Sequence, residues 1–131
     1  MKKKFRAWDK QCNWLTNVVC LNLGTWKDIV LIDPRGHNNQ TYSQSTENVV
    51  IQQYIGQKDS EGREVYEGDI LEDWYNEDYS SYKVTGQVAW SDGHCGFIVI
   101  DTKENAHLFI EELIKGKVIG NIFENPELLK L

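Results

Sequence analysis

Residues 59–73 read DSEGREVYEGDILED, and seven of these fifteen side chains are carboxylates. The stretch has two interpretations: a metal or acid/base site, or turn residues that separate short strands. Its two glycines, Gly62 and Gly68, favour turns because glycine adopts positive φ without a steric penalty. We therefore expect a short strand near residues 64–66, a bend at Gly68, and a further strand over ILEDWY at 70–75.

Strand patterns also surround this stretch. Alternating apolar residues, or short apolar runs between turn residues, predict strands at 4–8, 14–23, 27–33, 49–57, 83–90, 96–100 and 117–123. Asp92-Gly93 is a strong hairpin signal because both residues tolerate positive φ. Residues 33–48, DPRGHNNQTYSQSTEN, show no apolar periodicity and predict a mobile loop.

One segment carries a helical pattern. Asp101 and Glu104 can form a capping box, and Gly116 is a natural stop. Helical spacing then creates one apolar face from Ala106, Phe109, Ile110, Leu113 and Ile114. Near the end of the chain, Asn125 and Pro126 predict the start of a short second helix.

These elements predict a mainly β chain with one helix, at the margin of the α+β class. The favoured architecture is a small, strongly bent antiparallel barrel or sandwich, SH3-like in part, with the C-terminal-region helix packed on it. A chain of 131 residues can bury roughly two thirds of its extended surface in one core. A single domain over residues 1–131 is therefore expected.

The net charge of −6 argues against a nucleic-acid partner, because affinity for phosphates comes largely from Lys and Arg. The one basic run consists of Lys2, Lys3, Lys4 and Arg6. A nucleic-acid-associated protein would require this run to join other cations in one patch. The longest apolar runs, at 29–32 and 97–100, have the length of strands, so we expect no signal peptide, no membrane span and a cytoplasmic location.

The residues that could supply sulfur or nitrogen ligands are Cys12, Cys20, Cys95, His37, His94 and His107. They show no CxxC pair and no recognised zinc-ligand spacing. His107 and Glu111 are four residues apart on the expected helix, but on its solvent side. We therefore assign no catalytic, cofactor-binding or metal-ligating residue, expect no cofactor, and expect reduced structural cysteines.

A carboxylate-dependent hydrolase, with or without a divalent metal, remains as an alternative. It would need at least two of four acids to converge with His94 in one pocket. Those four acids are Glu64, Glu67, Asp69 and Glu72. Each carboxylate of the stretch also has a local structural explanation, because the acids accompany turn glycines or a neighbouring Arg63. We therefore lean towards a protein that is not an enzyme.

A better candidate for function is the aromatic segment WYNEDYSSY at residues 74–82. Its aromatic side chains are Trp74, Tyr75, Tyr79 and Tyr82. Rigid amphipathic rings mixed with Asn and Ser are typical of protein-binding surfaces, because they gain contact area at low entropic cost. Alternatively, the same rings cap the edge of the barrel or pack onto neighbouring strands.

Four segments of the chain resemble the YopX protein family, a group of small proteins encoded largely by bacteriophages and prophages. They are FRAWD at 5–9, YIGQKDSEGREVYEGDIL at 54–71, GQVAWSDGHCGF at 86–97 and VIGNIFENPELL at 118–129. The resemblance implies a phage- or prophage-derived accessory protein, and it transfers no activity, cofactor or catalytic residue. Residues 21–48 and 72–83 lie outside it.

Together, these features predict an accessory protein that acts in the cytoplasm of a bacterial host by protein–protein binding. The expected partners are a second copy of the chain, in a homo-oligomer, and an unknown host or phage protein.

Overall fold

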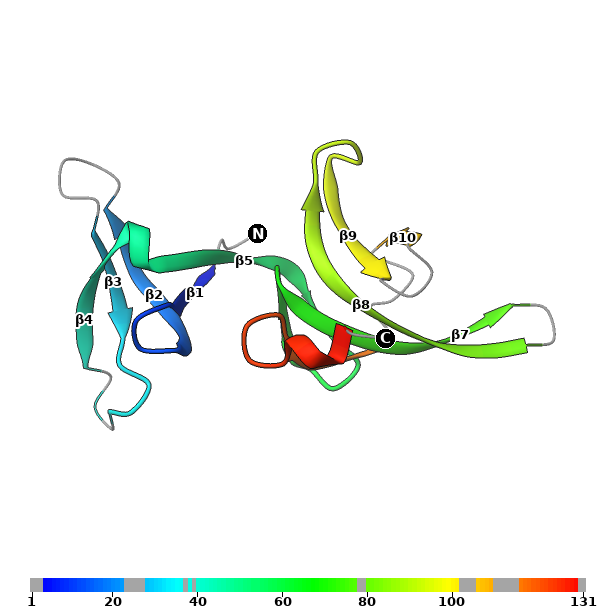
Figure 1. Cartoon of the computed structure of the whole chain (residues 1–131), viewed down its shortest axis with the longest axis horizontal. Coiled ribbons are helices and arrows are strands. Elements are labelled where there is room, and N and C mark those ends of the chain that lie inside the picture. Colours follow the sequence, from blue (N-terminus) through cyan, green and yellow to red (C-terminus); the bar gives the residue numbers. More distant parts are fainter. Residues whose placement is uncertain are drawn as a thin grey trace. The chain divides into compact units, whose positions relative to one another are not determined.

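The computed structural model describes residues 4–22, 28–36, 38, 40–77, 80–101, 106–109 and 116–129. The chain divides into two compact units, Met1–Gln53 and Tyr54–Leu131 (Figure 1). Strands dominate the described residues, and every strand pair among them is antiparallel. The mainly β prediction is confirmed at this level. The expectation of one domain over residues 1–131 stays a prediction.

The first unit is a meander of short strands. Its elements are β1 (Phe5–Asp9), β2 (Trp14–Asn22), β3 (Asp28–Ile32), β4 (Thr41–Ser45), the 3-10 helix η1 (Thr46–Asn48) and the beginning of β5 (Val49–Lys58). Their order in the sheet is β4-β3-β2-β1-β5. Alternate residues of the central strands point inward and form a small core of Ala7, Ile29, Leu31 and Val49. The strands predicted at 4–8 and 14–23 are confirmed as β1 and β2, and they pair with each other as a hairpin.

The loop predicted at residues 33–48 is wrong over its second half. Thr41–Ser45 forms β4 and pairs with β3, with Leu31 opposite Tyr42. This strand lacks apolar alternation, and its Tyr42 and Gln44 side chains bond to Asp9 instead. A partner so distant in sequence cannot be read from the pattern of the strand itself. His37, within the predicted loop, lies outside the described residues.

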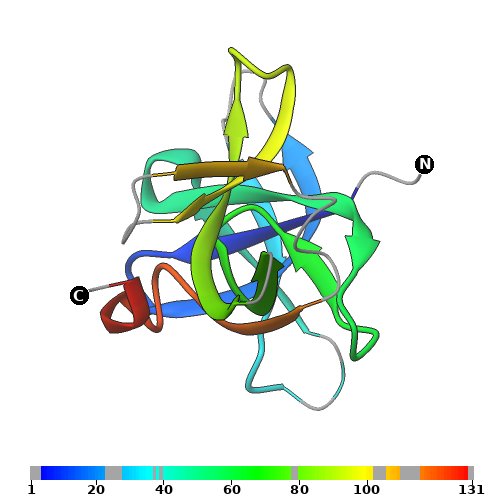
Figure 2. The same ribbon diagram turned by 90° about the vertical axis from the view of Figure 1, so that its right-hand side faces the viewer.

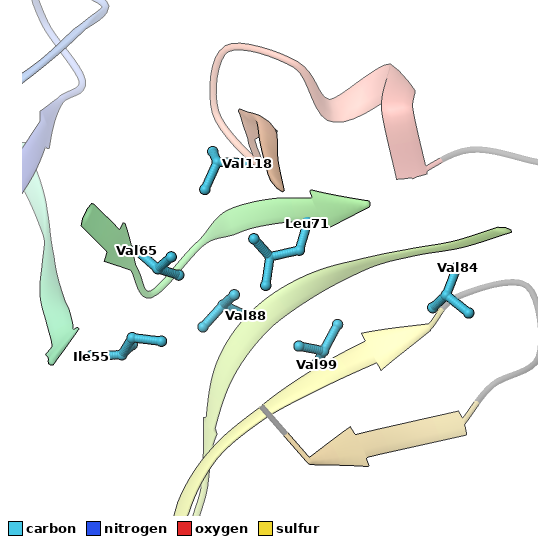
Figure 3. Packing of buried hydrophobic residues seen from close by; sticks show 7 residues of the cluster. All are labelled: Ile55, Val65, Leu71, Val84, Val88, Val99 and Val118. Atoms are coloured by element: carbon cyan, nitrogen blue, oxygen red, sulfur yellow. The ribbon is translucent and has the colours of Figure 1, made fainter. Parts of the chain in front are cut away.

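The second unit contains the acid-rich stretch. Its elements are the rest of β5, β6 (Glu64–Tyr66), β7 (Asp69–Glu77), β8 (Ser80–Ser91), β9 (Gly96–Asp101), β10 (Ala106–Phe109), β11 (Lys117–Asn121) and the 3-10 helix η2 (Pro126–Leu129). The main sheet has the order β10-β9-β8-β7-β11, and β6 pairs with β5. The core of this unit, shown in Figure 3, consists of Ile55, Val65, Leu71, Val84, Val88, Val99 and Val118.

The predicted C-terminal-region helix is wrong where it can be tested. Ala106–Phe109 is strand β10 and pairs with β9, with Ala106 opposite Asp101. Strand β9 is apolar on both faces, so a neighbouring strand at its edge satisfies backbone groups that a helix would leave unpaired. The rest of the predicted helical face, together with Glu104 and Glu111, lies outside the described residues. The short helix predicted at Pro126 is present as η2.

The closed-barrel alternative is also wrong for the portion of the chain that the structure describes. The sheet that includes β6 ends at β4 and β6, and the other sheet ends at β10 and β11, so neither closes on itself. Within the same residues, no helix is long and apolar enough to cross a membrane.

The two glycines of the acid-rich stretch do mark turns. Gly62 has φ of 82° and Gly68 has φ of 85°, and both values lie in the left-handed region that favours glycine. Gly68 also fixes the position of its turn, because its N–H donates to the Val88 carbonyl and its own carbonyl accepts from the Ile122 N–H. The prediction of a bend between β6 and β7 is confirmed.

Candidate functional site

The aromatic segment of residues 74–82 lies in a two-stranded ribbon. Asp73–Glu77 of β7 pairs with β8, and Tyr75 is directly opposite Tyr82. In the part of the chain that the structure describes, the neighbouring strands do not accompany this region, since β11 pairs with β7 only as far as Glu72 and β9 pairs with β8 only from Gly86 onward. Figure 1 shows the end of β7 and the start of β8 running on together beyond β9. Among the described residues, the ribbon therefore has strand neighbours only within itself.

Trp74 is the most exposed large apolar side chain that the structure describes, with 62% of its surface accessible. It lies opposite Lys83, whereas the core residue Val84 lies opposite Asp73. Because successive residues of a strand face opposite sides, Trp74 lies on the face of the sheet away from this core. Lys83 Nζ lies 3.1 Å from Glu72 Oε2, so an ion pair accompanies the indole on that face.

Trp90, on the same sheet, is a useful contrast. It is 51% exposed, but its ring packs edge-on against Phe97 at 5.2 Å between centroids. Its Nε1 also donates to Asp92 Oδ1 at 2.7 Å. It is seven residues from Lys83 on β8, an odd separation, so it lies on the opposite face from Trp74. Trp90 is thus held by its own hairpin turn, which stands at the top of Figure 2.

The remaining aromatic candidates are placed only partially. Tyr75 and Tyr82 occupy paired positions in the ribbon, and Tyr79 lies outside the described residues. For Trp74, an exposed fraction of 62% argues against the alternative that the ring packs onto neighbouring strands; the alternative that the rings cap a sheet edge stays a prediction. The segment therefore offers at least one large apolar side chain to solvent.

The acid-rich stretch contains a buried carboxylate that organises backbone. Asp59 Oδ1 accepts the N–H groups of Glu61 at 2.9 Å and Arg63 at 2.8 Å, and Oδ2 accepts the Val118 N–H at 2.9 Å. Burial alone would raise the pKa of Asp59, but these three bonds outweigh it and hold the pKa below its ordinary value. Asp59 thus ties the β5–β6 turn to β11.

Asp69 has a similar role in the next turn. It is buried, and its Oδ2 accepts the Tyr66 N–H at 2.8 Å across the turn that contains Gly68. The sequence correctly indicated scaffold turns, but it did not reveal that two of the acids are buried acceptors. The Asp-Ser-Glu-Gly and Glu-Gly-Asp sequences were the available signal, since Asp side chains commonly bond to backbone N–H groups two to four residues away.

His94 lies in the β8–β9 turn, where its Nδ1 is 2.8 Å from Ser91 Oγ. The turn of Gly68 meets β8 at Val88, and three strand residues from Val88 to Ser91 span about 10 Å. The structure therefore separates His94 from Asp69, and it uses Asp69 as a backbone acceptor. Glu72 is paired with Lys83 instead, so neither of these two acids supports the hydrolase alternative.

The thiol and imidazole candidates are similarly dispersed. Cys12, Cys20 and Cys95 are free and exposed, so they do not belong to a core. Across the described ranges, no group of three His, Cys, Asp or Glu side chains could hold a metal ion. His107 is in strand β10, so the helical spacing assumed for it and Glu111 is wrong.

A buried carboxylate in the first unit was missed by sequence reasoning. Asp9 Oδ1 accepts the N–H groups of Gln11 and Cys12, at 2.9 and 3.0 Å. Its Oδ2 accepts the Tyr42 hydroxyl at 2.7 Å and the Gln44 amide at 3.2 Å. Burial alone would raise the pKa of Asp9, but these bonds outweigh it and hold the pKa below its ordinary value.

Aromatic and basic side chains lie around this carboxylate. Trp14 Nε1 donates to the Tyr42 hydroxyl oxygen at 2.7 Å, and burial together with Asp9 raises the pKa of Tyr42. The Arg35 guanidinium lies 4.8 Å from the centre of the Trp14 ring and forms an ion pair with Asp33 at 3.2 Å. The polar groups of Asp9, Trp14, Tyr42 and Gln44 bond to one another. We therefore interpret this network as a structural one that joins β1, β2 and β4.

Of the basic run, the structure describes Lys4 and Arg6. Lys2 and Lys3 lie outside the described residues, and Lys4 is exposed. Arg6 Nε donates to Gln52 Oε1 at 2.8 Å, across the β1–β5 pair. Arg6 therefore has a structural partner within its own sheet.

A family model and two solved structures match nearly the whole chain. The family model described as YopX protein matches residues 4–130. Protein EF1440 from Enterococcus faecalis is similar in structure, with 29% identity, a TM-score of 0.68, and coverage of 99% of each chain. Protein yopX from Bacillus subtilis has 21% identity and a TM-score of 0.60, over 99% of this chain and 100% of that chain. No curated protein sequence matches the chain.

Proposed function

Because the chain belongs to the YopX protein family, we propose that it is a phage- or prophage-derived accessory protein that acts by protein binding and self-association. Its proposed place of action is the cytoplasm of the bacterial host. The proposed contact surface is the ribbon of Asp73–Glu77 and Ser80–Thr85, centred on Trp74.

A single observation carries this proposal. Trp74 leaves 62% of its surface in solvent, on the face of the sheet away from the core of its unit. Indole rings are enriched at the centres of protein interfaces, where they supply a large share of the binding energy. The ion pair between Lys83 and Glu72 beside the ring resembles the polar rim that surrounds such an anchor.

The structural use of the chain's acids supports a binding role over a catalytic one. Asp59 and Asp69 bond to backbone N–H groups, and Glu72 is paired with Lys83. A carboxylate that accepts several N–H bonds is stabilised as an anion, and it is a poorer general acid or base at neutral pH than one with a raised pKa.

The proposal is tested by comparing two tryptophan variants of the whole chain. Bait protein is used to capture partners from cells in which the prophage is induced, and the affinity of each captured protein is then measured after purification. We expect Trp74→Ala to weaken the partner's affinity at least ~10-fold, as loss of an interface anchor does. Trp90→Ala, the matched control on the opposite face, should leave that affinity unchanged.

Two results would overturn the proposal. In the first, Trp74→Ala and Trp90→Ala proteins bind every captured partner as tightly as the wild type. In the second, no purified partner binds and the wild-type chain sediments as a monomer at all concentrations. Thermal unfolding of both variants serves as the folding control. Trp74→Ala, at a mostly exposed side chain, should change stability by less than about 0.5 kcal/mol, whereas Trp90→Ala also loses the ring contact with Phe97 and the bond to Asp92, so its binding is compared only at temperatures where it is folded.

A further inference from the structure

The ribbon presents strand edges that no described strand covers. Ser80–Thr85 has β7 on one side, and its other side lies beyond the pairing with β9, which begins at Gly86. Asp73–Glu77 is in the same position on the β7 side, since β11 pairs only as far as Glu72. Open edges are templates for another strand, and an isolated two-stranded ribbon is only marginally stable in water.

The hydrogen bond between Gly68 and Val88 identifies which backbone groups face outward. The Val88 carbonyl accepts the Gly68 N–H at 2.8 Å, so the backbone groups of Val88 point towards β7. The N–H and C=O of one strand residue share an edge, and the edges alternate along the strand. Tyr82 and Val84 therefore face β7, and Ser81 and Lys83 face the open edge.

The charge along the two edges distinguishes them. Asp73 and Glu77 both lie on the β7 edge. If β7 paired with its own copy about Tyr75, each Asp73 would lie opposite a Glu77, and like charges directly opposite each other are destabilising. The β8 edge, SSYKVT at 80–85, carries a single charge and several residues with high strand propensity. A second copy of the chain therefore fits the β8 edge better than the β7 edge.

Resting on the self-association in the proposed function, we propose that two copies of the chain pair antiparallel through the outer edge of Ser80–Thr85, about a two-fold axis at Tyr82. In this register, Ser81 of one copy and Lys83 of the other exchange both backbone hydrogen bonds, and the two Tyr82 residues are directly opposite. An axis at Lys83 would place the two lysines opposite each other. An axis at Val84 would carry the second strand onto Gln87, which already pairs with Ile100 of β9.

The dimer joins the β8 strands of the two copies into one continuous sheet. Cross-strand partners share a face, so Trp74, its partner Lys83 and the facing Ser81 of the second copy lie on one side. Both Trp74 side chains are therefore presented on the same face of the joined sheet. A six-residue edge buries less than a standard protein interface, so the dimer forms reversibly and requires roughly micromolar or higher concentrations.

The test uses two proline variants of the whole chain. Asn76 and Ser81 are cross-strand partners, and their N–H groups point to the two opposite edges of the ribbon, which no described strand covers. Proline removes the outward N–H in each case without removing a bond between β7 and β8. In sedimentation velocity over a concentration series, we expect Ser81→Pro to weaken dimerisation at least ~10-fold, and Asn76→Pro to leave it unchanged.

Amide hydrogen exchange of the wild-type chain provides a measurement that does not depend on variant folding. As the concentration rises, exchange should slow at the outward amides of Ser81 and Lys83, with no change at the inward amides of Tyr82 and Val84. The inference is overturned if the wild type stays monomeric, if Ser81→Pro dimerises like the wild type, or if these outward amides show no dependence on concentration. If Ser81→Pro still dimerises, only the proposed pairing through the β8 edge is refuted. The proposed function is tested separately, by the dependence of partner binding on Trp74.

Discussion

Replacing Asp59 by alanine removes the acceptor of three backbone N–H groups in one step. The Val118 N–H is buried, and an unsatisfied buried donor costs about 1–3 kcal/mol. The N–H groups of Glu61 and Arg63 lie in a partly exposed turn where water can replace the carboxylate, so each loss costs only about 0.5–1.5 kcal/mol. Since such losses do not add fully, Asp59→Ala should lower the free energy of unfolding by about 3 kcal/mol.

The assay is urea unfolding followed by tryptophan fluorescence, with hydrogen exchange at the Val118 amide as a local readout. Glu61→Ala is the matched control, because it removes the same charge from an exposed position in the same turn. It should change stability by no more than about 0.5 kcal/mol. In Asp59→Ala alone, the Val118 amide should exchange faster than in the wild type.

The pH dependence gives the prediction a second, independent arm. The folded-state pKa of Asp59 is depressed, so the stabilisation that its carboxylate supplies is fully present above the unfolded pKa of about 4 and is lost as the pH falls through the folded pKa. The difference in stability between wild type and Asp59→Ala should therefore shrink steadily below about pH 4. The reasoning is refuted if Asp59→Ala is no less stable than Glu61→Ala at pH 7, or if their difference is the same at pH 7 and pH 3.

Two further predictions concern stability in each unit. Tyr42→Phe removes a hydrogen-bond donor to the buried Asp9 carboxylate, so it should lower the free energy of unfolding by about 1–2 kcal/mol and raise the pKa of Asp9. Acid unfolding should then begin at a higher pH than in the wild type. An unchanged acid midpoint would contradict this. Gly62→Ala meets open space at a positive φ and should cost about 1 kcal/mol, whereas Gly86→Ala would place its Cβ 2.5 Å from Val99 Cγ1 and should cost about 3 kcal/mol. Equal melting temperatures for the two glycine variants would show that this close contact is absent.

Sequence patterns predicted the strands well where alternation and glycine turns agreed. β5 and β8 combine apolar alternation with clear turn residues, β9 is a short apolar run after the Asp92-Gly93 turn, and all three are present. The segment at Ala106–Phe109 misled because helical spacing can arise by chance in a strand whose register is decided by its neighbour β9. Propensity is a weak prior, and tertiary pairing overrides it.

The candidate site was predictable only as a composition. The run of aromatic residues near Trp74 indicated a binding surface, and the structure adds its exposure and the face on which it lies. The network of Asp9 could not be predicted, because Tyr42 and Gln44 come from a segment without apolar periodicity and are separated from Asp9 by more than thirty residues. Partners so distant in sequence leave no local pattern.

The hydrogen bonds that join the β5–β6 turn at Asp59 to Gly116 and β11 affect the order in which the second unit folds. Asp59 and Val118 are 59 positions apart, and Ser60 likewise donates to the Gly116 carbonyl. A contact at this separation forms only after a long loop has closed, and such contacts slow folding. During synthesis, the acid-rich turn therefore emerges from the ribosome well before its last acceptor and donor groups find partners. The second unit cannot complete its folding until β11 has been made, and fragments that end before Lys117 should be open to proteolysis at residues 59–63.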